Sequence, residues 1–148
     1  MNILKIKNLL LASVLLVFPT SIFAGSGHYH YDGPDISGAK IKIFGPWLAP
    51  EDESFRDVLS IFEKETGASV EYGGSDEFEQ IINIDCKAGN PADIAVFPQP
   101  GLAANIAATG CLAPQGNDLK QMVLDDYAAG QSWVDWTTYA DANGKDQF

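Results

Sequence analysis

The chain has 148 residues and a formal net charge of −11, from 20 acidic and 9 basic side chains. This length predicts one domain or part of one. Because the net charge is strongly negative, we expect no binding to nucleic acid or to anionic membrane. The charge permits a neutral or cationic ligand, and solubility alone explains it equally well.

The first 24 residues have the pattern of a secretory signal peptide. Lys5 and Lys7 form a basic start, an apolar run covers residues 9–18, and Ala24 is a small residue at the expected cleavage position. The run is too short to span a bilayer. We therefore expect residues 1–24 to be removed and the protein to be periplasmic, with an uncleaved anchor as the alternative.

Strands and helices alternate after a flexible N-terminal tail, which the composition predicts at residues 25–38. Strands are expected at residues 39–44, 68–72 and 92–97, the last apolar enough to be buried on both faces. Helices are expected at residues 51–66, from Asp76 to a stop at 89–91, and at 102–108. This order predicts an α/β fold with a parallel sheet and flanking helices.

Two helices carry recognisable terminal signals, and the C-terminal part carries weaker ones. The first helix has an apolar face, made by Phe55, Val58, Leu59 and Phe62, and Gly67 is placed to end it. Asp76 and Glu79 resemble a capping box. Toward the C-terminus we expect a helix at 117–128, an extended segment at 133–139, and a hairpin turn at 141–144 that leads into a strand.

The two cysteines, Cys86 and Cys111, lie 25 positions apart. In an oxidising compartment an even number of cysteines suggests a disulfide, which would stabilise the fold by about 3.5 kcal/mol. Two buried thiols acting as small hydrophobic side chains are the alternative, and the sequence does not decide between them.

Ligands of open parallel sheets bind beyond the carboxyl ends of the strands. That rule selects three loops, at residues 45–50, 73–76 and 98–101. Trp47 in the first loop offers an aromatic face to a sugar ring, while Asp76 and Gln99 can hydrogen-bond its hydroxyl groups. The alternatives are that Trp47 packs on its own helix and that Asp76 only caps the next one.

Catalysis finds little support in the sequence. No pair of carboxylates stands out, and there is no Gly-x-Ser-x-Gly elbow, phosphate loop or zinc spacing. We therefore expect a non-catalytic protein with no cofactor and no metal site.

A family resemblance rests on FEKETG, VEY and GNPADIAVFPQPG, which occur in this order, and less sharply on YAAGQSWVDW. With these motifs the chain resembles the N-terminal part of the periplasmic sugar-binding proteins of ABC transporters. This is the extracellular solute-binding family that includes maltose-binding protein, and the similarity is greatest to its alpha-glucoside-binding members.

The resemblance implies two α/β lobes that close on a sugar and deliver it to membrane permease subunits. It also implies ligand contacts from the three loops, at Trp47, Leu48, Glu51, Ser75, Asp76, Gln99 and Pro100. Members of the family are much longer than this chain. We therefore expect residues 39–148 to form a partial N-terminal lobe, cut off before the second lobe.

The function indicated is non-catalytic capture of an alpha-glucoside or oligosaccharide in the periplasm for an ABC importer. Two alternatives remain at this point. One is a truncated product with little or no ligand binding, and the other is a fragment of a secreted glycan-cleaving enzyme.

Overall fold

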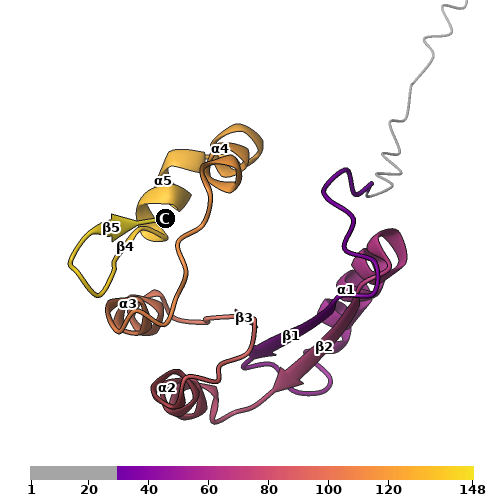
Figure 1. Ribbon diagram of the computed structural model, residues 1–148, viewed down its shortest axis with the longest axis horizontal. Helices are drawn as coiled ribbons and strands as arrows, with labels where there is room; N and C mark the ends of the chain where they lie inside the picture. The colour runs from indigo at the N-terminus through magenta and orange to yellow at the C-terminus, as the bar shows by residue number, and fades with distance from the viewer. Residues whose placement is uncertain (1–29) are drawn as a thin grey trace, which may run out of the picture.

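The computed structural model describes residues 30–148, so the predicted signal peptide and the start of the predicted tail lie outside the described residues. The chain forms an α/β structure in which helices flank a small parallel sheet, as predicted (Figure 1). The elements are β1 (Lys40–Gly45), α1 (Glu53–Thr66), β2 (Ser69–Gly74), α2 (Phe78–Ala88), β3 (Ile94–Ala95), α3 (Pro100–Ala108), α4 (Asn117–Asp126), α5 (Gly130–Trp136), β4 (Tyr139–Ala140) and β5 (Asp146–Gln147).

The three-stranded sheet has the order β2-β1-β3, with both neighbours of β1 parallel to it. The chain therefore moves to one side of β1 through α1 and back across it through α2. With right-handed crossovers, this reversal places α1 and α2 on opposite faces of the sheet. The carboxyl ends of all three strands consequently meet at one edge, where the three predicted ligand loops begin.

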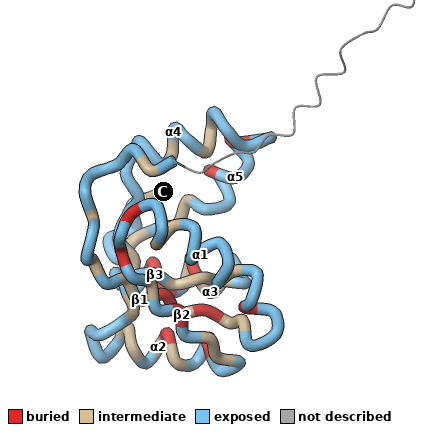
Figure 2. Tube along the Cα trace, turned by 90° about the vertical axis from the view of Figure 1, so that its right-hand side faces the viewer, coloured by how far each residue is buried: buried red, intermediate tan, exposed pale blue. Residues whose placement is uncertain are grey.

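The main hydrophobic core lies between one face of the sheet and helices α2 and α3. Phe78, Ile82 and Ile106 are almost fully buried there, and Phe44 packs against them from β1. The rings of Phe44 and Phe78 lie 5.1 Å apart. Figure 2 shows buried residues gathered around the sheet and α2, which gives these elements a shared core.

The opposite face of the sheet packs against α1. Consecutive side chains along a strand point to opposite faces of the sheet, so the side chain of Ile43 lies on the α1 side while that of Phe44 faces α2. Phe55 of α1 contacts Tyr72 of β2 with ring centroids 5.2 Å apart. Val58, expected in the apolar face of α1, is instead exposed. Gly67 ends the helix in the left-handed conformation, as predicted.

The third strand is shorter and more exposed than the sequence predicts. Only Ile94 and Ala95 pair with β1, and Ile94 is 48% exposed rather than buried. The reason is that Ile94 borders a large cavity beside β3, so packed side chains do not cover it. The predicted burial of residues 92–97 on both faces is therefore wrong for the described chain.

Helix α2 begins later than the capping pattern predicts. Its first residue is Phe78, and no side chain caps it. The Ser75 hydroxyl oxygen instead accepts a hydrogen bond from the Glu77 amide at 3.1 Å, within the turn that precedes the helix. The capping box of Asp76 with Glu79 is not formed, so Asp76 is left exposed to solvent.

The segment predicted to be extended at residues 133–139 is mostly helical. Helix α5 covers Gly130–Trp136 and buries Val134, with the Gln131 side chain donating to Asp135 one turn later. Gly130 allows α5 to approach α4, because a Cβ there would lie 2.7 Å from the Leu124 Cα. Packing against α4 therefore outweighs the weak strand preference of this stretch.

The predicted hairpin is present at the C-terminus. Strands β4 and β5 pair antiparallel, and the Gly144 amide donates to the Asp141 carbonyl at 2.9 Å to close the turn. The Asp141 carboxylate also accepts from the amides of Asn143 and Lys145. These bonds hold the pKa of Asp141 below its usual value, with the Lys145 amide contributing most.

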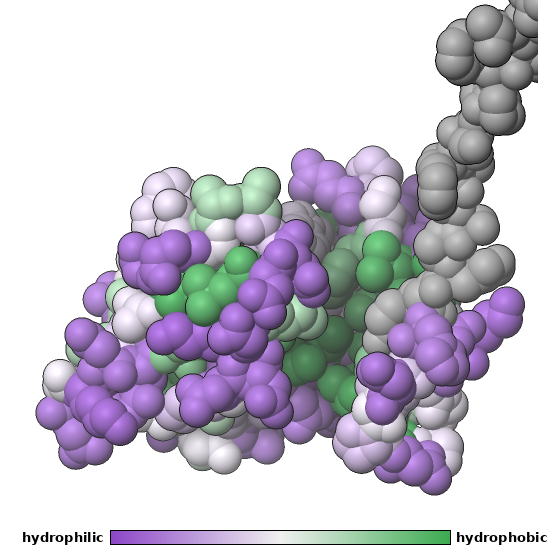
Figure 3. Space-filling model, turned by 90° about the horizontal axis from the view of Figure 1, so that it is seen from above, coloured by the Kyte–Doolittle hydropathy of each residue, from purple (hydrophilic) through white to green (hydrophobic). Residues whose placement is uncertain are grey.

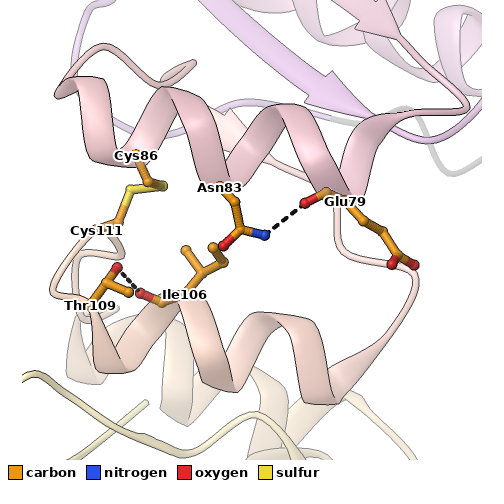
Figure 4. Close-up of a disulfide and its surroundings, with 6 residues drawn as sticks. All are labelled: Glu79, Asn83, Cys86, Ile106, Thr109 and Cys111. Atoms are coloured by element: carbon orange, nitrogen blue, oxygen red, sulfur yellow. Dashed lines mark hydrogen bonds between the residues drawn. A yellow bond between two sulfur atoms is a disulfide. The ribbon is translucent and has the colours of Figure 1, made fainter.

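A disulfide joins the last turn of α2 to the segment that follows α3 (Figure 4). It links Cys86 to Cys111 with their Cα atoms 5.7 Å apart. Both residues pack against the Phe78, Ile82 and Ile106 core. The bond therefore ties together the two helices that enclose the core on this face.

In the described part of the predicted tail, Tyr31 packs edge-on against Phe62 of α1, and the Gly38 amide donates to the Gly67 carbonyl.

Within residues 30–148, no helix has the length and hydrophobicity needed to cross a membrane.

Candidate functional site

The first two predicted ligand loops form one structural unit. Gly45 pairs with Gly74 at the ends of β1 and β2, and the Ser75 amide donates to the Gly45 carbonyl at 3.0 Å. The Gly74 backbone also lies directly against the Trp47 carbonyl oxygen, where an added Cβ would overlap it. The two loops are thus held in register by backbone contacts.

Trp47 is half-buried at this junction. Its ring lies 5.2 Å from that of Phe55 and 6.4 Å from that of Tyr72. The indole therefore packs on its helix, as one sequence alternative proposed, and it also retains an exposed part at the carboxyl edge of the sheet. The structure makes the two roles compatible.

The other two predicted ligand residues at this loop, Leu48 and Glu51, are exposed. Leu48 and Glu51 lie in the turn between Trp47 and α1, where the Glu51 amide donates to the Leu48 carbonyl at 2.8 Å. The Glu51 carboxylate makes no hydrogen bond among the described residues. Both therefore stand beside Trp47 with their side chains accessible.

In the second loop, Ser75 and Asp76 differ in what they can offer. The Ser75 amide and hydroxyl are engaged by Gly45 and Glu77, as described above. Asp76 is exposed, and its carboxylate makes no hydrogen bond within residues 30–148. Asp76 thus has acceptor oxygens available at the junction, while Ser75 mainly shapes the loop.

The third loop carries Gln99 and Pro100, both exposed at the start of α3. The Gln99 carbonyl accepts a hydrogen bond from the Ala103 amide at 3.3 Å. The Gln99 side chain makes no capping hydrogen bond to α3. The Val96 amide donates to the Phe44 carbonyl at 2.9 Å, which starts this loop beside the end of β1. No hydrogen bond in the described chain joins Gln99 to the first two loops.

Sequence reasoning missed a group of residues beneath Trp47. Asp52 is only 6% exposed and accepts a hydrogen bond from Arg56 at 2.7 Å. Arg56 also donates to the Tyr72 carbonyl at 3.2 Å, and its guanidinium carbon lies 5.3 Å from the Tyr72 ring centroid. The spacing of Asp52 and Arg56, one helical turn apart, was the available signal. Nothing in the sequence pointed to Tyr72.

The environment of Tyr72 alters its acidity. Burial raises the pKa of the Tyr72 phenol above its ordinary value, opposed in part by the hydrogen bond to the Trp47 backbone. The phenol therefore stays protonated, and able to donate a hydrogen bond, throughout the physiological range.

A separate cavity of about 650 Å³ lies next to β3 and α3. Its wall includes Ile94, Ala103 and the exposed indoles of Trp133 and Trp136, and of the predicted site residues only Pro100 contributes. Seen from above, the molecule is hollowed and hydrophobic residues gather in the hollow (Figure 3). Trp47 and Asp76 do not line this cavity, so it is distinct from the junction of the first two loops.

Within residues 30–148, no group of three or more histidine, cysteine or acidic side chains is arranged to hold a metal ion.

Comparison with known proteins finds two binding proteins for small solutes. The chain is 49% identical over 114 residues to the alpha-glucosides-binding periplasmic protein AglE of Rhizobium meliloti, an alignment that covers 77% of this chain and 24% of AglE. It is 34% identical over 107 residues to the osmoprotective compounds-binding protein GgtB of Synechocystis, covering 70% of this chain and 25% of GgtB. No family model matches the chain.

These similarities agree with the resemblance found in the sequence motifs. The chain spans about a quarter of the length of the curated relatives that it matches. Over that part it is similar to two proteins that are named for binding small solutes.

Proposed function

We propose that this chain supplies one wall of a non-catalytic binding site for a sugar, an alpha-glucoside or an oligosaccharide, in the periplasm. The observation that carries the proposal is the junction of the first two loops, where backbone contacts join the loop with a half-exposed indole to the loop with an exposed carboxylate. Trp47 supplies an apolar face for a pyranose ring, and Asp76 supplies acceptors for its hydroxyl groups. The relation to AglE, which is named for alpha-glucosides, favours this ligand class.

The proposed physiological role is delivery of the captured solute to the permease subunits of an ABC importer. It rests on the relation to two binding proteins, neither of which is named as an enzyme. GgtB is named for osmoprotective compounds, so a solute of that kind is the second candidate ligand.

The proposal is tested by isothermal titration of the purified chain with maltose, trehalose and sucrose, with circular dichroism recorded to establish folding. We expect heat of binding with at least one sugar. Replacing Trp47 by alanine should weaken that binding at least tenfold, a loss of about 1.4 kcal/mol, because the ring loses its apolar platform.

Trp136→Ala is the matched control, since it removes an indole that is 67% exposed and lies outside the loops. It should leave the affinity unchanged. A folded chain that releases no heat with any of the three sugars would contradict the proposal for this polypeptide. Equal affinity of the Trp47→Ala variant would remove Trp47 from the site.

A further inference from the structure

The backbone of Trp47 is held by the hydroxyl group of Tyr72, which lies on strand β2. The Trp47 amide donates to the Tyr72 hydroxyl oxygen at 2.9 Å, and the same hydroxyl donates to the Trp47 carbonyl oxygen at 3.2 Å. A tyrosine hydroxyl has one donor and can also accept, so both bonds form at once. Tyr72 therefore pairs with both main-chain polar groups of the residue that carries the indole.

Tyr72 is itself fixed from several sides. It is 4% exposed, and its ring packs edge-on against Phe55. Arg56 covers the ring and donates to the Tyr72 carbonyl, while Asp52 holds Arg56 through a 2.7 Å ion pair. The hydroxyl thus occupies a position set by α1 and β2 rather than by the loop that it holds.

Glycines make room for this arrangement. A Cβ on Gly45 would lie 2.8 Å from the Tyr72 hydroxyl oxygen, and a Cβ on Gly74 would overlap the Trp47 carbonyl oxygen. Only residues without side chains allow the tyrosine to reach under the loop, and the second loop to lie against it. The strand ends are therefore shaped around the contact between Tyr72 and Trp47.

We infer that Tyr72 is a positioning residue for ligand binding, which holds the Trp47 indole at a fixed place and angle relative to the second loop. The inference rests on the proposed function, in which Trp47 contacts the sugar. A platform that is rigid before binding loses less conformational freedom when the ligand arrives. Tyr72 therefore contributes to affinity without touching the sugar.

Tyr72→Phe isolates the hydroxyl, because phenylalanine keeps the ring contacts with Phe55 and Arg56. Tyr139→Phe is the matched control, since Tyr139 is a half-buried tyrosine whose hydroxyl makes no hydrogen bond in the described residues. Both changes are made in a chain with Trp133→Phe and Trp136→Phe, so that Trp47 is the only source of indole fluorescence.

Two properties are measured, namely quenching of Trp47 by acrylamide without sugar and the affinity for the sugar that binds best. In the Tyr72→Phe variant we expect about a twofold larger quenching constant and about a fivefold weaker affinity, the effect of one net hydrogen bond. The Tyr139→Phe variant should change neither property. Unchanged quenching and affinity in Tyr72→Phe would overturn the inference.

The outcomes separate this inference from the proposed function. If the unsubstituted chain binds no sugar, the proposed function fails and the quenching of Trp47 alone decides whether Tyr72 positions it. If Tyr72→Phe does not fold, hydrogen exchange of the Trp47 amide in the unsubstituted chain decides. Protection of that amide supports the inference, and exchange at the rate of exposed backbone overturns it.

Discussion

Removal of the disulfide tests how the segment between α2 and α3 contributes to stability. The bond joins residues 25 positions apart, and the closed loop contains β3, the third ligand loop and α3. In the chain-entropy model, closing a loop of this length destabilises the unfolded chain by about 3.5 kcal/mol at room temperature. Most of that effect should be lost when the bond is absent.

The paired substitution of Cys86 and Cys111 by serine is expected to lower the free energy of unfolding by about 3 kcal/mol. The contacts of the neighbouring core are expected to survive, since Phe78, Ile82 and Ile106 remain in place. The dependence of this free energy on urea concentration should also become steeper, because an unfolded chain without the cross-link exposes more surface.

Urea unfolding followed by circular dichroism measures both quantities. The unsubstituted chain kept in a reducing agent is the control, and it should unfold like the serine variant. The serine variant itself should not respond to the reducing agent. A loss of stability below about 1 kcal/mol, the size of an ordinary point substitution, would refute the reasoning from loop closure.

Two further predictions concern single sites. Gly74→Ala should weaken sugar binding measured by titration and shift the Trp47 emission, because the new Cβ overlaps the Trp47 carbonyl oxygen and forces the two loops apart; unchanged values would contradict this contact. The pKa of Asp141 is lowered in the folded chain, so its stabilising effect on the hairpin is present above the ordinary value of 3.8 and is lost as the pH falls through the lowered pKa. Hydrogen exchange of the Lys145 amide should accelerate over that acidic range, and Asp141→Ala should make it fast at every pH.

Local signals predicted the parts of the fold that are determined locally. The apolar period of α1 and the glycine that ends it lie within 15 residues of each other, and the structure has the helix and its end as predicted, although Val58 of the apolar face is exposed. The C-terminal hairpin follows from Asp141 and Gly144, whose backbone and side-chain bonds all fall within the turn. Such elements need no information about distant residues.

The failed predictions depend on neighbours that are distant in sequence. The apolar run at residues 92–97 has the pattern of a strand buried on both faces, but such burial requires packed layers on both faces and Ile94 borders a cavity. The run at 133–139 is too short for periodicity to distinguish helix from strand. Its helical form follows from packing against α4, where Gly130 allows close approach.

The candidate site shows the same division. Its loops and the exposed indole follow from the sequence, because the carboxyl ends of parallel strands are recognisable in order. The hydroxyl that holds Trp47 comes from Tyr72, 25 residues further along the chain. Only the parallel register of β1 with β2 brings the two together, and register is a property of the folded sheet.

Under the proposed function, the loop junction suits a sugar better than the larger cavity does. The carboxylates that line the cavity are already engaged, Asp93 by the Lys42 amide at 2.8 Å and Asp141 by the amides of its own turn. Most of the other lining residues, such as Ile82 and Phe97, are apolar. The hydroxyl of Tyr139 is unpaired within the described chain and offers a partner there, but each further sugar hydroxyl buried without one would cost about 1–3 kcal/mol. At the loop junction, by contrast, the carboxylate of Asp76 is exposed and unpaired within the described chain, so a sugar hydroxyl can replace its water without that loss.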